Sequence, residues 1–334
     1  MSRAANAVAA RAALVAGAFS LGAHAEPSSL PPEIGYNYSE IETPRVAAMA
    51  GAQRAFSNSL DALFANPANM AVTRVYHLGA FAQIWPEARR QSYGAAAVDS
   101  YVSSTRLAGG IGGTWNLQDP DGIERQWSDL RFALAFPFSD QFFAGLGGRH
   151  VWLSQDGSDP ELGASPASGG LKDENIVQGF SFDAGATLKP TRELAISIVG
   201  NNLNNPGSGF QPASVGGGIG YGNEDLTLEV DLVSDFTTWD ETTVRAMAGF
   251  ELLLGDHYPI RAGYRYDQGP DSHSLSLGVG YLESAFSAEL AVRRVVSPGD
   301  LNPAVGGDQG ATTIVFGFKY HLETNLSSGP SDTF

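Results

Sequence analysis

Apolar residues alternate with small or polar residues through most of the chain after residue 71. The clearest runs are 226–232 (LTLEVDL), 258–266 (YPIRAGYRY), 275–281 (LSLGVGY) and 314–322 (IVFGFKYHL). In each run one face carries Leu, Ile, Val, Phe or Tyr, and the other carries Gly, Ser or a charged residue. A period of two predicts a β-strand with one apolar face. Clusters of Gly, Pro, Asn and Asp between the runs predict turns.

Fourteen such runs follow one another, and no helical periodicity interrupts them. They cover residues 72–85, 90–101, 106–117, 127–136, 142–153, 178–188, 194–201, 213–222, 226–235, 243–254, 258–267, 272–282, 285–296 and 311–322. An even number of antiparallel strands is the rule for bacterial single-chain outer-membrane barrels. The pattern therefore predicts an all-β protein, a transmembrane antiparallel β-barrel of about 14 strands over residues 72–322.

The gaps between runs alternate in length, as they do in outer-membrane barrels with short periplasmic turns and longer outer loops. Predicted periplasmic turns are 102–105, 137–141, 189–193, 223–225, 255–257 and 283–284, and the long outer connections include 154–177, 202–212 and 297–310. Aromatic residues near run ends are expected to face outward as interfacial girdles; they are Tyr76, Trp85, Trp115, Trp152, Tyr264, Tyr281 and Tyr320. A secreted β-solenoid or sandwich remains the alternative.

The first 25 residues have the form of an export signal. Arg3 and Arg11 make a basic region, residues 12–22 an apolar core, and Ala23, His24 and Ala25 a cleavage site. That apolar core is shorter than the roughly 20 helical residues a bilayer requires. No other stretch has 18 consecutive apolar residues, which excludes a helical inner-membrane protein. We expect an integral protein of the Gram-negative outer membrane with both termini in the periplasm and a polar tail at 323–334.

The amino-acid composition excludes some classes of binding partner. The chain has no cysteine, so neither disulfides nor thiolate metal sites stabilise it after export. It carries 36 Asp and Glu against 20 Lys and Arg, and this acidic balance argues against nucleic acid as a partner. Much of the excess acid lies in the predicted outer connections at 119–124, 155–161, 172–174 and 235–241. We expect these loops to be solvated, with divalent-cation binding at the lipopolysaccharide surface as the alternative.

Residues 45–71 form a different kind of segment, rich in small residues, between the signal and the first strand. Their position before a barrel predicts a plug, so residues 26–71 are expected to form a short helical or irregular hatch inside the lumen. Glycines inside the strands, as in 109–113 and 216–220, would leave room for it.

Strand alternation also assigns charged residues to the lumen. They are Asp129, Arg131, Arg149, Asp183, Glu229, Asp231, Arg245, Glu251, Arg261, Arg265, Asp267, Glu289, Arg293 and Lys319. Acids and bases are equal in number, whereas an open ion pore shows a bias of sign. Two interpretations remain: a lattice of ion pairs that braces a plug, or charges that select a solute.

Catalytic motifs are missing. The sequence has no G-x-S-x-G, no H-E-x-x-H and no P-loop, and its six histidines are isolated from one another. We therefore expect no enzyme activity, no cofactor and no metal site.

The ordered residues Asn58, Asp61, Asn66, Pro67 and Ala68 resemble the N-terminal hatch of the FadL-like outer-membrane barrels. This resemblance implies a 14-stranded barrel with the hatch inside. Three later motifs are similar to the PorV/PorQ branch, whose barrels associate with export machinery: residues 201–203 (NNL), 258–266, and 275–281 followed by 286–292.

Two functions follow from these features. The main hypothesis is a plugged, non-enzymatic barrel that binds protein partners in an envelope machinery for export, surface attachment or motility, in contact with outer-membrane lipid and lipopolysaccharide. The alternative is a FadL-like channel that takes up hydrophobic small molecules such as fatty acids or hydrocarbons. Apolar contacts to such a ligand would come from Leu60, Leu63, Phe64 and Met70.

Overall fold

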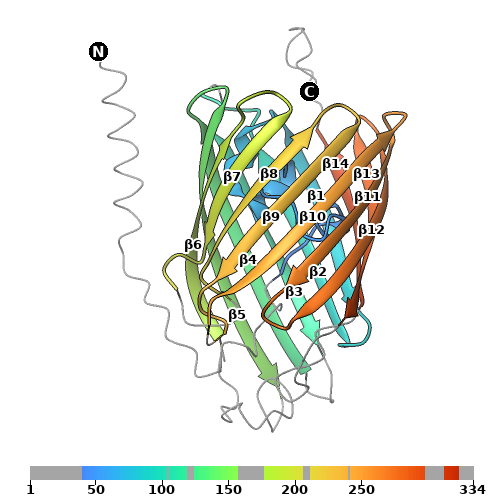
Figure 1. Ribbon diagram of the computed structural model, residues 1–334. Helices are drawn as coiled ribbons and strands as arrows, with labels where there is room; N and C mark the ends of the chain where they lie inside the picture. Colours follow the sequence, from blue (N-terminus) through green and yellow to red (C-terminus); the bar gives the residue numbers. More distant parts are fainter. Residues whose placement is uncertain are drawn as a thin grey trace.

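The computed structural model describes residues 40–103, 105–118, 124–156, 177–205, 211–239, 241–297 and 312–322. These residues form fourteen strands that close into one antiparallel barrel (Figure 1). The predicted fold class and strand number are confirmed. The predicted signal peptide, the polar tail and most of the three acidic stretches at 119–124, 155–161 and 172–174 lie outside the described residues.

The strand bounds follow the period-two runs closely. The strands are β1 Tyr76–Trp85, β2 Arg90–Asp99, β3 Ala108–Gln118, β4 Glu124–Pro137, β5 Phe142–Asp156, β6 Val177–Leu188, β7 Leu194–Asn201, β8 Ser214–Gly222, β9 Leu226–Asp235, β10 Thr243–Leu254, β11 Tyr258–Asp267, β12 Ser272–Leu282, β13 Phe286–Ser297 and β14 Thr312–His321. β1 begins four residues later than predicted, because residues 72–75 connect it to a preceding helical turn.

Closure comes from the pairing of the first strand with the last. β1 pairs with β14 from His77 opposite His321 to Ile84 opposite Ile314, and every other strand pairs with its neighbours in sequence. Every strand therefore has a hydrogen-bonded neighbour on both sides, as the hydrocarbon core of a membrane demands. The pairing is shortest between β6 and β7, where it covers only Ala184 to Leu188 of β6.

The predicted alternation of short and long connections is only partly right. The β1–β2 and β11–β12 connections lie at the same end as the long ones but span only residues 86–89 and 268–271. Each contains a residue with positive φ, Arg89 at 46° and Asp271 at 49°, that closes a tight turn. At the other end the β2–β3 connection is longer than predicted, at residues 100–107. The alternation of apolar and polar residues predicts the strands, but it does not predict the lengths of all the connections between them.

The outward faces of the strands form an apolar belt. Large side chains such as Ile111 (56% exposed), Leu146 (63%) and Leu277 (67%) point away from the lumen on widely separated strands. Apolar side chains over the whole outer wall of a closed barrel suit lipid rather than water. No helix among the described residues is long and apolar enough to cross a membrane.

Among the predicted girdle aromatics, Trp115, Trp152, Tyr264 and Tyr320 are exposed on this belt. The expectation for Trp85 is wrong, since its side chain is only 3% exposed and faces inward. It shares the strand parity of the buried Phe81 and Gln83, and the guanidinium of Arg90 stacks over its ring at 3.5 Å. Parity in the strand, not nearness to the strand end, decides the direction of a side chain.

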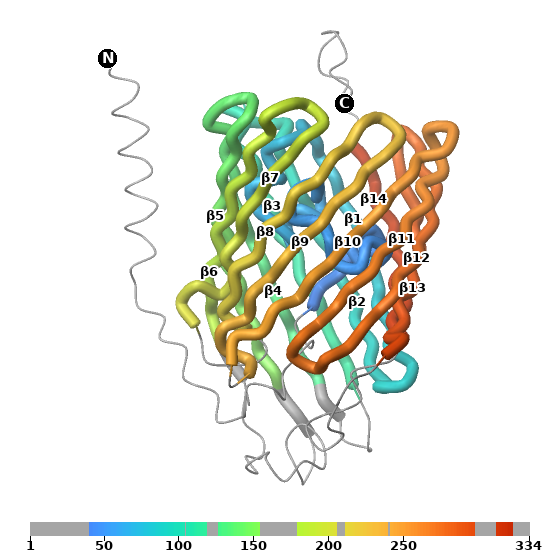
Figure 2. The backbone as a smooth tube through the Cα atoms, viewed as in Figure 1, coloured from blue at the N-terminus to red at the C-terminus, as the bar shows by residue number. Residues whose placement is uncertain are grey.

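Residues 40–71, called the inner segment from here on, lie inside the barrel (Figure 2, blue). They contain the helix α2 Pro44–Ala48, the helix α3 Ser59–Ala65 and the 3₁₀ turn η2 Pro67–Ala71. α2 packs against β11–β14, α3 against β1–β4, and η2 against β3–β6. Proline occupies the first turn of α2 and of η2, where its missing N–H is no loss.

Glycines of the wall allow the inner segment to approach the strand backbones. A Cβ atom on Gly145 would lie 2.6 Å from the backbone nitrogen of Ala68 and 2.6 Å from the carbonyl carbon of Pro67. Both are backbone atoms, so neither can move aside as a flexible side chain would.

We therefore expect Gly145→Ala to lower the free energy of unfolding by about 1 to 3 kcal/mol, because the new methyl overlaps η2. Gly109→Ala is the matched control, since its Cβ would meet only a Leu134 methyl at 3.6 Å. Thermal and denaturant unfolding of the purified barrels in detergent measures both. Equal stability of the two variants would contradict the close backbone contact.

Candidate functional site

The inner segment meets the barrel through two kinds of contact. Toward β9–β14 it forms ion pairs and charged hydrogen bonds, and toward β1–β5 it packs apolar side chains. A small charged cavity separates the inner segment from the wall between β4 and β11.

Two glutamates of the inner segment bind three arginines of the wall. Glu40 lies 2.5 Å from Arg245 and 2.7 Å from Arg265. Glu42 lies 2.6 Å from Arg293, which also approaches Glu40 at 3.7 Å. Burial by itself raises the pKa of the Glu40 carboxyl, but the three arginines outweigh it and hold that pKa well below its usual value. Glu40 is therefore charged at neutral pH.

Arg45 of α2 carries the opposite charge into the wall. Its guanidinium donates to both carboxylate oxygens of Glu251 at 2.8 and 2.9 Å, and also to the side chain of Gln53 and the carbonyl oxygen of Phe56 at 2.8 and 3.0 Å. Burial lowers the pKa of Arg45, but the facing carboxylates outweigh it and raise that pKa above its ordinary value. A bidentate pair of this kind fixes orientation as well as charge.

The charges continue along the wall to α3. Arg261 contacts Glu251 and donates to Glu289 at 2.9 Å. Lys319 lies 3.6 Å from Glu289 and 3.2 Å from Asp61 of α3. The chain of ion pairs therefore links α2 to α3 through the strands.

Two adjacent carboxylates of β9 bind the backbone of the inner segment. Asp231 accepts from the N–H groups of Gln53 and Arg54 at 2.9 and 3.0 Å. Glu229 accepts from those of Ala55 and Phe56 at 2.5 and 3.0 Å. Four consecutive N–H groups of a loop that forms no secondary structure are thus satisfied by two side chains of one strand.

The other predicted lumen charges pair mainly within the wall. Asp129 binds Arg149 at 2.6 Å and Arg131 at 3.4 Å, Arg245 and Arg265 bind Asp267 at 2.9 and 3.4 Å, and Asp183 accepts from the N–H of Asn202 at 2.7 Å. Arg131 also reaches the carbonyl oxygen of Phe64 in the inner segment at 3.2 Å. Each of the fourteen side chains thus has an ion-pair or hydrogen-bond partner inside the barrel. Their role as a brace for a plug stays a prediction.

The predicted apolar contact residues lie together on the opposite side of the inner segment. Leu60, Leu63, Phe64 and Met70 belong to one buried cluster, whose wall members include Phe81, Ala96, Val98, Ala108, Ala133, Ala135 and Phe143. The ring of Phe64 meets that of Phe81 edge to face, with centroids 5.7 Å apart.

The wall next to this cluster consists of small residues. A Cβ on Gly110 would lie 2.8 Å from the sulfur of Met70, and one on Gly112 would lie 3.0 Å from a methyl of Leu63. On the outer surface of the same strands is an apolar groove of about 610 Å³, lined by Leu78, Gly79, Ala80, Ala95, Ala96, Ala97, Ile111, Gly112, Gly113, Leu130, Phe318 and Tyr320. Only a thin layer of glycine and alanine separates the apolar cluster from the lipid side.

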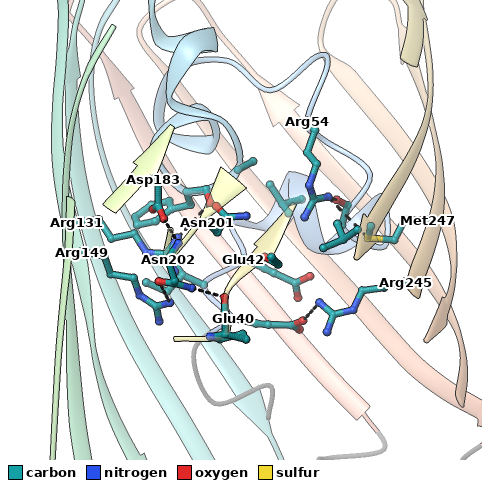
Figure 3. A pocket seen from close by; sticks show the side chains of 18 of the residues that line it. Glu40, Glu42, Arg54, Arg131, Arg149, Asp183, Asn201, Asn202, Arg245 and Met247 are labelled. Atoms are coloured by element: carbon teal, nitrogen blue, oxygen red, sulfur yellow. Dashed lines mark hydrogen bonds and ion pairs between the residues drawn. The ribbon is translucent and has the colours of Figure 1, made fainter. Parts of the chain in front are cut away.

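The inner cavity is small and charged. It measures about 150 Å³. Figure 3 shows Arg131, Arg149 and Asp183 on one side of it and Arg245 and Met247 on the other, with Glu40 and Glu42 between. Apolar side chains of Ile41, Val46, Phe64, Val233 and Met247 complete its lining.

Four of the five residues of the proposed hatch motif are buried, and the fifth, Asn58, is exposed. Asn66 is fully buried, accepts from the N–H of Ala68 at 3.1 Å and donates to the carbonyl oxygen of Arg54 and to Thr187 at 2.8 and 3.0 Å. Pro67 and Ala68 are buried in η2. Asp61 is buried and paired, as described above. Asn58 is exposed and its side chain does not cap α3.

Several residues that hold the inner segment were not predicted. Glu40, Glu42, Arg45 and Arg54 supply its charges, and the Asn69 amide donates to the carbonyl oxygen of Arg54 and to Ser57, both at 2.9 Å. A signal existed for the cations, because Arg45 and Arg54 are the only charged bases in a segment of small residues. Within the described residues, no three His, Cys, Asp or Glu side chains form a metal site.

Comparison with known proteins gives a fold. No family model and no curated protein matches the chain. Among solved structures it is similar to a Pseudomonas aeruginosa FadL homologue (16% identity, 84% of this chain and 98% of that chain, TM-score 0.58). It is also similar to the Ralstonia pickettii toluene transporter TbuX (14%, 85% and 99%, 0.58) and the CymD monoaromatic hydrocarbon channel (14%, 86% and 99%, 0.60).

The chain has the fold of FadL-like barrels. At this level of identity the similarity supports the resemblance drawn from the sequence as far as the fold is concerned. The narrower resemblance to the PorV/PorQ branch stays a prediction.

We expect Arg45→Met to weaken the attachment of the inner segment to β10, because it removes the bidentate partner of the half-buried Glu251. The free energy of unfolding should fall by about 3 kcal/mol or more, and single-channel conductance in planar bilayers should rise. Arg106→Met is the matched control: Arg106 pairs with Asp140 at the surface, where the side chains are 39% and 94% exposed, and such pairs contribute little. Unchanged conductance in Arg45→Met would contradict a closing role for this contact.

A pH dependence follows from Glu40. Its pKa in the folded state is below the ordinary value of 4.5, so its ion pairs contribute stability that is complete above pH 4.5 and is lost as pH falls through the folded pKa. The difference in unfolding free energy between the wild type and Glu40→Gln should therefore shrink as pH falls below 4.5. Denaturant unfolding from pH 7 to pH 3 measures it, and a constant difference would show that the charge of Glu40 is not what stabilises.

Proposed function

We propose that the protein is an outer-membrane channel for small hydrophobic molecules, closed in this structure by its inner segment. The observation that carries the proposal is the pair of apolar surfaces on the two sides of β1–β3. The cluster around Leu60 and Leu63 lies inside, the apolar groove lies outside, and small residues such as Gly112 and Ala96 separate them.

The fold supports this proposal. Structures that share it include, by their descriptions, a toluene transporter and a monoaromatic hydrocarbon channel. A molecule of that size and polarity would favour the apolar cluster over water. We infer that the solute passes along the contact between α3 and β1–β3 and leaves toward the lipid through the groove.

The charged contacts have a different role in this proposal. Ion pairs from Glu40, Glu42 and Arg45 fix the inner segment to β10, β11 and β13, so the apolar side of the segment is the side that can separate from the wall. The strands β1, β2 and β3 are paired along their lengths. Passage therefore requires a movement of the inner segment or the strands.

The partner-binding scaffold that was predicted first has less support. The proteins with this fold are described as transporters and channels, and the described outer wall is an apolar belt suited to lipid. Envelope protein partners, lipopolysaccharide contacts and periplasmic termini remain predictions.

Uptake of labelled toluene tests the proposal, in Gram-negative cells that lack their own hydrocarbon channel. Ala97→Trp fills the groove and should reduce uptake severalfold relative to the wild type. Ala248→Trp is the matched control, because Ala248 is exposed on β10 and lies outside the groove.

Two results would oppose the proposal. Wild-type uptake no greater than in cells without the protein would reject the channel. A reduction of equal size in both tryptophan variants would reject the groove as the exit and leave general damage to the barrel as the cause.

A further inference from the structure

Five residues of β1 face inward, and four of them make a specific contact with the inner segment or with a neighbouring strand residue. Ser59 hydrogen-bonds to His77, Leu60 covers Gly79, Phe64 packs on Phe81, and Arg90 stacks on Trp85. The remaining inward residue is Gln83, which is 1% exposed. Among the residues that the structure describes, neither its amide nitrogen nor its amide oxygen has a hydrogen-bond partner.

A second polar group without a partner lies beside it. Ser92 of β2 is directly opposite Gln83 in the β1–β2 register and is also 1% exposed. Its hydroxyl oxygen has no hydrogen-bond partner in the described part of the chain. Side chains opposite one another in an antiparallel pair have Cβ atoms about 5 Å apart. The next residue in the same row, Asn116, donates to Thr114 and to the carbonyl oxygen of Trp127, so the row as a whole is not short of partners.

Burial of these groups is unfavourable as they stand. An amide removed from water without a compensating hydrogen bond destabilises the folded state. Leucine at position 83 would avoid that cost and extend the apolar surface of Phe81. The amide and the hydroxyl are therefore available to pair with a group from outside the chain.

The position of Gln83 and Ser92 along the proposed solute path indicates which class of chemical group pairs with them. Trp85 ends β1 at the end of the barrel that carries the long connections, and Phe81 belongs to the apolar cluster. Gln83 lies between the two, so a solute that moves from that end to the cluster passes it. The amide offers one donor and one acceptor type and the hydroxyl offers both, without charge.

We propose that Gln83 and Ser92 determine specificity for apolar solutes that carry one neutral hydrogen-bonding group, a hydroxyl or a carbonyl. The polar group of the solute pairs with Gln83 and Ser92, and its apolar body lies against Phe81 and Phe64. This inference rests on the proposed channel function and narrows its solute class, since a bare hydrocarbon leaves both polar side chains without a partner.

Binding of 4-methylphenol and p-xylene to the purified full-length protein in detergent tests the inference. The two probes differ only by a hydroxyl in place of a methyl, and quenching of tryptophan fluorescence reports both, since Trp85 and Trp127 are buried on the same inner wall. The wild type should bind 4-methylphenol more tightly than p-xylene. Gln83→Leu should weaken 4-methylphenol binding about tenfold, the loss expected for one hydrogen bond, and leave p-xylene binding unchanged or stronger.

Two further variants complete the experiment, one as a second test and one as a control. Ser92→Ala removes a single atom and should weaken 4-methylphenol binding severalfold, which keeps the inference testable if Gln83→Leu does not fold. Gln91→Leu is the matched control, because Gln91 lies on the exposed face of β2, where its side chain accepts from the Tyr93 hydroxyl at 2.6 Å. It should change neither affinity.

The outcomes separate the two proposals. If the wild type binds p-xylene but Gln83→Leu and Ser92→Ala leave 4-methylphenol binding unchanged, the two polar groups pair with water only, and this inference alone fails. Tighter binding of 4-methylbenzoate than of 4-methylphenol would overturn the neutral solute class. If the wild type binds none of the probes, the inference falls together with the proposed function.

Discussion

Charges inside a closed barrel must be paired, and on the β9–β14 side much of the pairing comes from the inner segment. Arg245, Arg265 and Arg293 point inward from three strands, and their partners include Glu40 and Glu42. An unpaired charge in a partly dry interior is strongly unfavourable, so the segment is held in place by the same interactions that make this wall stable. The position of the inner segment against β9–β14 follows from that pairing.

On the opposite side of the inner segment, the space between its apolar side chains and the wall limits the size of the wall residues. Leu63 and Met70 lie against Gly112 and Gly110, where a side chain would overlap them. Apolar contacts of this kind are non-directional, so they can be replaced by another apolar body of similar size with little loss. Most ionic contacts of the segment therefore lie toward β9–β14, and its largest apolar cluster lies toward β1–β5.

Strand positions were predicted to within a few residues because period-two alternation is a local property, visible in runs such as 226–232. The same parity assigned Glu229 and Arg261 to the interior. The runs 72–85 and 90–101 also placed the connection at 86–89, but they did not show that its backbone turns at Arg89 with a positive φ. Trp85 was misplaced because its nearness to the strand end was given more weight than its parity.

By itself the sequence determined the number of strands, their faces and the presence of a distinct segment before them. Each of these features depends on the spacing of apolar and polar residues that are close together in the chain. Which charge pairs with which was decided only by the tertiary structure. Glu40 and Arg265 are 225 positions apart, and their contact depends on barrel closure and on the path of the inner segment across the lumen. The lack of a hydrogen-bond partner for Gln83 among the described residues was also decided by the tertiary structure, because it depends on which side chains the fold places around the amide.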